Sequence, residues 1–111
     1  MSKKTLHMDK YRTENIGIFS GRKRGESVRK AASIPNKDES DNQYIIVFPD
    51  DVYHVASSFF LGMFGDSIRK LGRESFKGKY EFTGPKALKR VVESGIDEAL
   101  KEESPLSRKA Q

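Results

Sequence analysis

The sequence predicts one small α/β domain in which a short, mostly parallel sheet of three to four strands packs with three helices. Its 111 residues suffice for a single core. Residues Gln43–Phe48 read QYIIVF, a continuous run typical of a central strand covered on both faces. A long amphipathic segment, from Ser57 or Ser58 to Leu71, separates this run from another extended segment, Tyr80–Phe82. Strand, helix and strand in this order indicate a parallel pair joined by a right-handed crossover.

Each helix is expected because apolar residues recur along one side of its segment. The first runs from Gly21 to Ala32, with Ser20 as its N-cap. The second stops at Gly72, and the third opens after Thr83-Gly84-Pro85. The residues expected to face the core are Val28, Ala31, Ala32 and Ile34 in the first helix, Phe60, Phe64, Ile68 and Leu71 in the second, and Leu88, Val91, Val92, Ile96 and Ala99 in the third.

The remaining segments are shorter. Lys4–Met8 and Ile16–Phe19 are expected to be extended, Pro35–Asn42 to form a polar surface loop, and Phe76 to lie in a short turn. This pattern divides the chain into a basic, partly ordered N-terminal segment (residues 1–15), the folded domain (residues 16–101) and a flexible C-terminal tail (residues 102–111).

Composition excludes several classes of protein. The absence of cysteine rules out disulfides and thiolate chemistry and fits a reducing compartment. The N-terminus lacks the apolar segment of a secretion signal, and the longest apolar stretch, near Val55 to Gly65, is shorter than the ~18 residues that suggest a membrane span. We therefore expect a cytoplasmic protein with no membrane segment.

No set of residues indicates catalysis. The sequence offers no nucleophile with a matching base and orienting residue, and it lacks a glycine-rich phosphate-binding loop. His7 and His54 are too few and too far apart in sequence for a metal site. We expect a protein that is not an enzyme and binds neither cofactor nor metal.

Basic residues crowd the first third of a chain whose formal net charge is +5, which favours acidic partners such as nucleic acid. Arg22, Lys23 and Arg24 fall in the first turn of the predicted helix, where each exposed cation opposes the helix dipole by about 0.3–1 kcal/mol. Arg29 follows further along this helix. These residues either form a solvated face or bind an anion: a phosphate, a nucleic-acid backbone or an acidic loop of a partner.

Three stretches carry a family resemblance. In SGRKRGESVRK, the residues Arg22, Gly25, Val28 and Arg29 have the spacing Arg-x-x-Gly-x-x-apolar-Arg, and IIVFPDDVYHVASSFFLGMFGDSIRKLG and ESFKGKYEF follow in order. Together they resemble the STAS-like domain family, small bacterial modules related in outline to the anti-sigma factor antagonists, over Phe19 to Lys101. The resemblance implies a regulatory module with a protein partner of the histidine-kinase-like ATPase or anti-sigma type.

Ser57 and Ser58 open the long helix and admit two interpretations. Either their hydroxyls cap the helix, or Ser57, which aligns with the serine phosphorylated in the antagonists, is a phosphoacceptor within a contact surface. Tyr53 belongs to the same candidate surface. Phe59, Phe60 and Phe64 span more than one helical face, so we expect Phe59 to be exposed as a contact residue.

These features predict a non-catalytic regulatory module that binds a protein around the start of the long helix. One alternative is a nucleic-acid- or anion-binding protein that uses the basic first third. Another is an inhibitor encoded by a phage or mobile element. The oligomeric state is open.

Overall fold

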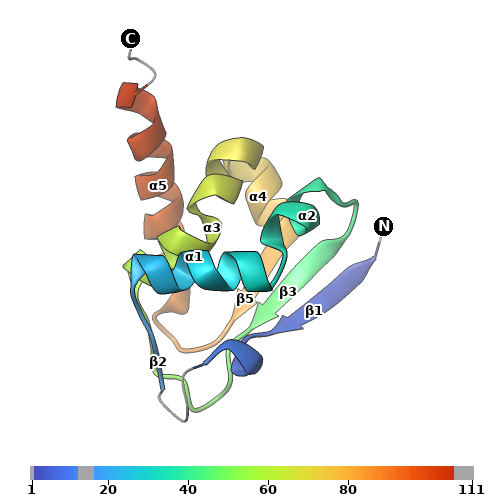
Figure 1. Cartoon of the computed structure of the whole chain (residues 1–111), viewed down its shortest axis with the longest axis vertical. Helices are drawn as coiled ribbons and strands as arrows, with labels where there is room; N and C mark the ends of the chain where they lie inside the picture. The colour runs from blue at the N-terminus through green and yellow to red at the C-terminus, as the bar shows by residue number, and fades with distance from the viewer. Residues whose placement is uncertain (1, 13–16, 107–111) are drawn as a thin grey trace.

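Residues Gln43–Val47 form β3, the middle strand of the main sheet (Figure 1). The computed structural model describes residues 2–12 and 17–106, and side chains as far as residue 102. β3 pairs in parallel with β1 (Lys3–His7) on one side and with β5 (Tyr80–Thr83) on the other. The predicted fold class is therefore confirmed: a short parallel sheet packed with helices in one α/β domain.

The helices cover only one face of this sheet. Successive side chains of a strand point to opposite faces. The side chains that share the inner face and are buried are Leu6, Tyr44, Ile46 and Tyr80. On the outer face, Ile45 and Val47 remain partly exposed. The expectation that β3 is covered on both faces is wrong, because β-branched residues favour a strand whether or not its second face is packed.

Two short strands form a second parallel sheet beside the beginning of the long helix. They are β2 (Ile18–Phe19) and β4 (His54–Val55), and the amide of Ala56 donates to the carbonyl oxygen of Phe19 at 2.8 Å. Ile16, predicted to begin the first of these extended pieces, lies outside the described residues. A short 3-10 helix, η1 (Met8–Tyr11), follows β1.

The three predicted helices are α1 (Arg22–Ala31), α3 (Ser57–Leu71) and α5 (Leu88–Leu106). The predicted caps are wrong. Gly21, with a φ of 92°, is the N-cap of α1 in place of Ser20, and Ala56 is the N-cap of α3, without a side-chain hydrogen bond in either case. The predicted stop at Gly72 is confirmed, since its φ of 85° suits a residue without a Cβ.

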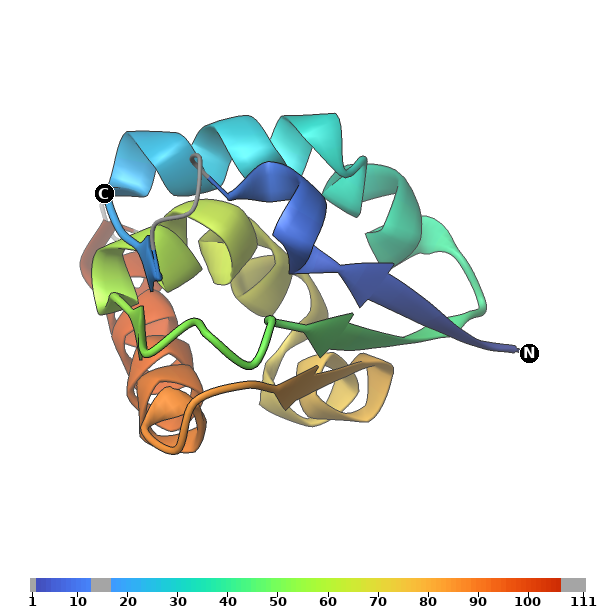
Figure 2. The ribbon, with the colours of Figure 1, turned by 90° about the horizontal axis from the view of Figure 1, so that it is seen from below.

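α1 and α3 cross at two glycines. A Cβ atom on Gly25 would lie 2.2 Å from the carbonyl oxygen of Phe59, and one on Gly62 would lie 2.1 Å from the carbonyl oxygen of Arg22. The two backbones therefore approach more closely than any side chain would allow. This crossing places the first turn of α1 beside the first turns of α3 (Figure 2).

Two short helices replace segments predicted to be irregular. α2 (Ile34–Glu39) lies where a polar loop was expected over Pro35–Asn42, and α4 (Arg73–Lys79) lies where a turn was expected around Phe76. Helices this short depend on tertiary contacts for stability. α2 buries the carboxylate of Asp38, and α4 buries the ring of Phe76. Neither contact is visible in the local pattern.

The core is a cluster of aromatic rings between α3, α4 and the inner face of the sheet. The ring of Phe64 lies 5.6 Å from Phe76 and 5.3 Å from Phe82, edge-on to both. Of the residues predicted to face the core, Leu71 and Val91 are partly buried and Ala31 is exposed. The others, all buried, are Val28, Ala32, Ile34, Phe60, Phe64, Ile68, Leu88, Val92, Ile96 and Ala99.

Both ends of the chain contribute more structure than the sequence pattern indicates. Leu6 and Met8 belong to the core, so the folded part begins at Lys3 and not at residue 16. At the other end, α5 continues to Leu106, past the expected beginning of the tail at residue 102. Among the described residues, no helix combines the length and apolar character that crossing a membrane requires.

Candidate functional site

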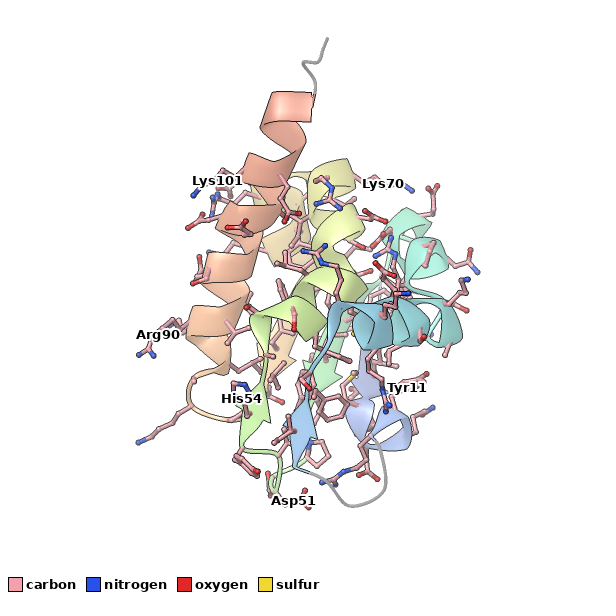
Figure 3. All side chains as sticks on the ribbon, turned by 60° about the vertical axis from the view of Figure 1, so that its left-hand side comes forward. Tyr11, Asp51, His54, Lys70, Arg90 and Lys101 are labelled. Carbon is pink, nitrogen blue, oxygen red and sulfur yellow. The ribbon has the colours of Figure 1, made fainter. Side chains whose placement is uncertain are left out.

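Tyr53, Ser57 and Ser58 lie where β4 passes into α3, and we call these three residues the α3-start surface. Tyr53 is 70% exposed, as predicted. Among the residues the structure describes, no other large hydrophobic side chain is exposed. Its amide donates to the carbonyl oxygen of Gly17 at 2.9 Å, which fixes the backbone below the ring. The neighbouring His54 is also exposed (Figure 3).

The two serines are exposed, and they differ in their contacts. The Ser58 hydroxyl accepts a hydrogen bond from the amide of Gly21 at 3.2 Å, which links the start of α3 to the N-cap of α1. The Ser57 hydroxyl makes no hydrogen bond to any described residue. Since neither serine caps α3, the capping interpretation is wrong. Ser57 occupies the first position of the helix, with its hydroxyl free to react or to bind.

Phe59 does not belong to this surface. Its side chain is 1% exposed, and its ring lies 5.2 Å from that of Phe19 on β2. The prediction that Phe59 is a contact residue is therefore wrong. α3 is covered by α1 on one side, by α5 on another and by the aromatic core on a third. Phe59, Phe60 and Phe64 are therefore all buried, although they lie on different faces of the helix.

Three of the four candidate anion-binding residues are engaged within the molecule. Arg22 forms an ion pair with Glu102 of α5 at 3.3 Å. Arg24 donates to the carbonyl oxygen of Tyr11 at 2.6 Å, which ties α1 to η1. Lys23 is exposed and has no ion pair within the described chain. The first turn of α1 therefore offers one free cation and not a cluster of three.

Arg29, the fourth candidate, lies in a buried polar cluster centred on Asp38. Its guanidinium donates to the Met63 carbonyl oxygen at 2.9 Å and to the Ser67 hydroxyl at 2.8 Å, and lies 3.4 Å from the Asp38 carboxylate. Asp38, whose side chain is fully buried, also accepts hydrogen bonds from Ser67 at 2.6 Å and from Tyr80 at 2.7 Å. Arg29 thus compensates a buried carboxylate instead of facing an external anion.

The Asp38 cluster shapes the chemistry of Tyr80. Burial raises the pKa of the Tyr80 phenol, and its hydrogen bond to Asp38 raises this pKa further. Tyr80 therefore stays protonated and acts as a hydrogen-bond donor. The cluster joins α1, α2, α3 and β5, and every polar group described here has a partner. We assign it a structural role, which sequence reasoning missed because Asp38 lies in a segment without apolar residues.

Among the described residues, no three His, Cys, Asp or Glu side chains are grouped so that they could hold a metal ion. Comparisons with protein-family models, with curated protein sequences and with solved structures find no match to this chain. The functional argument therefore depends on the geometry of the molecule itself.

Proposed function

We propose that this protein is a non-catalytic, cytoplasmic regulatory module that binds a partner protein through the α3-start surface. The exposure of Tyr53, at 70%, is the single observation that carries the proposal. Tyrosine is enriched at the energetic centres of protein interfaces, since its ring contributes apolar area and its hydroxyl a hydrogen bond at a small entropic cost.

The surroundings of Tyr53 suit such a contact. The backbone is held by the hydrogen bond from Tyr53 to Gly17, and the link between Ser58 and Gly21 holds the adjacent helix starts together. A rigid surface loses little conformational entropy when it binds. The exposed hydroxyls of Ser57 and Ser58 supply a polar rim. The STAS-like resemblance adds a partner class, a histidine-kinase-like ATPase or an anti-sigma-type protein.

Ser57 gives the surface a means of regulation. Phosphorylation there would add negative charge at the first position of α3, where the helix dipole stabilises an anion. The helix would persist while the surface changed its charge. We propose that phosphorylation of Ser57 weakens partner binding, and that Ser57→Asp reproduces the effect. Ser94→Asp, at an exposed position within α5, is the matched control.

Site-specific photo-crosslinking tests the assignment. Benzoylphenylalanine replaces Tyr53 in one variant and Glu74, exposed on α4, in another, and both are irradiated in lysate of the source cells, with and without nuclease treatment. The proposal expects a discrete protein adduct from position 53 alone. It further expects Tyr53→Ala to weaken binding of the captured protein by about tenfold or more. Equal adducts from both positions, or adducts that vanish with nuclease, would overturn it, and the latter result would favour nucleic-acid binding.

A further inference from the structure

The outer edge of β5 borders a hollow of about 570 Å³ between β5, α4 and the start of α5. β5 is an outer strand of the main sheet, since it pairs with β3 alone. This region shares no residue with the α3-start surface. An unpaired strand edge beside a hollow can accept a further extended segment.

The β5 edge presents free backbone groups. The Thr83 carbonyl oxygen accepts a hydrogen bond from the Phe48 amide at 2.9 Å, so the backbone N–H and C=O of Thr83 point toward β3. The N–H and C=O of successive residues point to alternate sides of a strand, and those of Phe82 therefore point away from β3. No described residue bonds to the outward amide or carbonyl of Phe82. An extended segment laid along this edge would pair with them.

Apolar residues contribute to the lining of the hollow beside this edge. They are Phe82 of β5 and Leu88 and Val92 of α5. In strand addition, backbone hydrogen bonds supply affinity and a neighbouring pocket selects one side chain of the added segment. These three apolar residues suit an aliphatic side chain of an added strand.

The rim of the hollow is positively charged. Lys77 is neutralised by Glu93 at 2.8 Å, and Glu81 by Lys3 at 3.4 Å. Lys86 and Lys89 also line the hollow, are exposed, and have no ion pair within the described chain. The uncompensated charge of the rim is therefore that of two lysines.

The positive charge of Lys86 and Lys89 favours some binding segments over others. A second copy of the chain, paired edge to edge, would bring four unpaired lysines together and would be repelled. Residues 107–111 of the chain carry Arg108 and Lys109 and no acidic side chain, so they have the same sign of charge as the rim. A partner segment rich in Asp and Glu has the complementary charge.

We infer that the β5 edge binds an extended, acidic peptide segment of a partner protein by strand addition. The segment pairs with the outward N–H and C=O of Phe82, places one aliphatic side chain over Phe82, Leu88 and Val92, and directs its carboxylates to Lys86 and Lys89. This second contact surface does not depend on the function proposed for the α3-start surface.

Fluorescence polarisation with three labelled probe peptides tests the inference. The acidic probe is Asp-Glu-Val-Thr-Val-Thr-Val-Glu-Asp. A basic probe has Lys at the four charged positions, and a third probe is the acidic one with Pro as its central residue, which removes one ladder donor and fixes φ. The protein variants are Lys86→Glu with Lys89→Glu, and a matched control, Lys30→Glu with Lys101→Glu. The control lysines are also exposed and unpaired in the described chain, and Lys101 lies at the far end of α5 from Arg90 (Figure 3).

The wild type is expected to bind the acidic probe more tightly than the other two, with an affinity that falls as salt rises. Reversal of Lys86 and Lys89 should weaken this binding by about tenfold, and reversal of Lys30 and Lys101 by about twofold or less. Chemical-shift changes in the protein should centre on Phe82. No binding of the acidic probe up to ~1 mM, equal losses in the two double variants, or equal binding of the proline probe would each overturn the inference. Tyr53→Ala should leave probe binding unchanged, so this test and that of the proposed function fail independently.

Discussion

The arginines of α1 and two lysines near the start of α5 look alike in sequence as clusters of cations, and they differ in their use. In α1, Arg22, Arg24 and Arg29 reach Glu102, the Tyr11 carbonyl and the Asp38 cluster. At the start of α5, Lys86 and Lys89 extend into solvent without an ion pair to any described residue. One set of cations holds elements of the fold together, and the other is free to meet a partner.

The difference teaches that a run of cations identifies a binding surface only after its internal partners have been counted. Arg is suited to the internal role, because its planar guanidinium donates several hydrogen bonds in fixed directions. Lys carries a compact charge on a flexible stem, and it remains hydrated when exposed. The arginines of α1 should therefore matter for stability, and Lys86 and Lys89 near the start of α5 for binding.

The largest effect is expected where the α1 cations meet the core. Asp38→Ala should lower the free energy of unfolding by about 3–5 kcal/mol, because it leaves Arg29 and the Tyr80 hydroxyl buried without their acceptor. Urea denaturation monitored by circular dichroism measures the loss. Asp38→Asn keeps an oxygen acceptor and should cost less. If Asp38→Ala costs under ~1 kcal/mol, the cluster is not structural and Arg29 is available for another role.

The next largest loss of stability is expected at the crossing of α1 and α3. Gly25→Ala should lower the free energy of unfolding by about 1–3 kcal/mol, because its Cβ would collide with the Phe59 backbone 2.2 Å away. Gly78→Ala is the control, since no atom lies within 4 Å of a Cβ there and alanine favours a helix by up to about 1 kcal/mol. Thermal unfolding of the two variants should shift in opposite directions. A neutral Gly25→Ala would contradict the close crossing.

The same distinction between local and tertiary information explains what the sequence predicts of this fold. β3 and α3 are recognised because QYIIVF and the spacing of Phe60, Phe64 and Ile68 are local patterns. α2 is missed because its stability comes from Asp38, whose partners are 9, 29 and 42 residues away in sequence. The sequence of Ile34–Glu39 alone does not predict those contacts.

Some features of the candidate site also follow from local sequence, whereas others depend on tertiary contacts. The exposure of Tyr53 follows from its place in a polar turn between apolar segments. The burial of Phe59 does not follow from α3 alone, because it depends on Phe19 of β2 being brought against that side of the helix. Likewise, the internal use of Arg24 becomes apparent only when η1 is seen to offer the Tyr11 carbonyl.

A smaller effect concerns Arg12, a cation of the first third that is also engaged internally. Hydrogen bonds from its guanidinium, at 3.0 and 3.1 Å, lower the pKa of the Asp51 carboxyl. A carboxyl with a lowered folded pKa adds stability above its unfolded pKa, near 3.8, and this contribution is lost as pH falls through the folded value. Asp51→Asn should therefore flatten the dependence of the urea midpoint on pH below about pH 4. Asp50→Asn is the control of equal charge, and an identical pH profile for Asp51→Asn and wild type would contradict the pairing.

The smallest effect on stability is expected at the free cations of α5. Lys86→Glu with Lys89→Glu breaks no ion pair in the described chain and replaces cations near the start of a helix with anions, which the dipole favours. The free energy of unfolding should stay within about 0.5 kcal/mol of the wild type or rise slightly. Arg24→Glu is the contrasting variant, because it removes the hydrogen bond to Tyr11 and should destabilise. If reversing the lysines costs as much as Arg24→Glu, then the α5 cations also hold the fold together, and the contrast with α1 disappears.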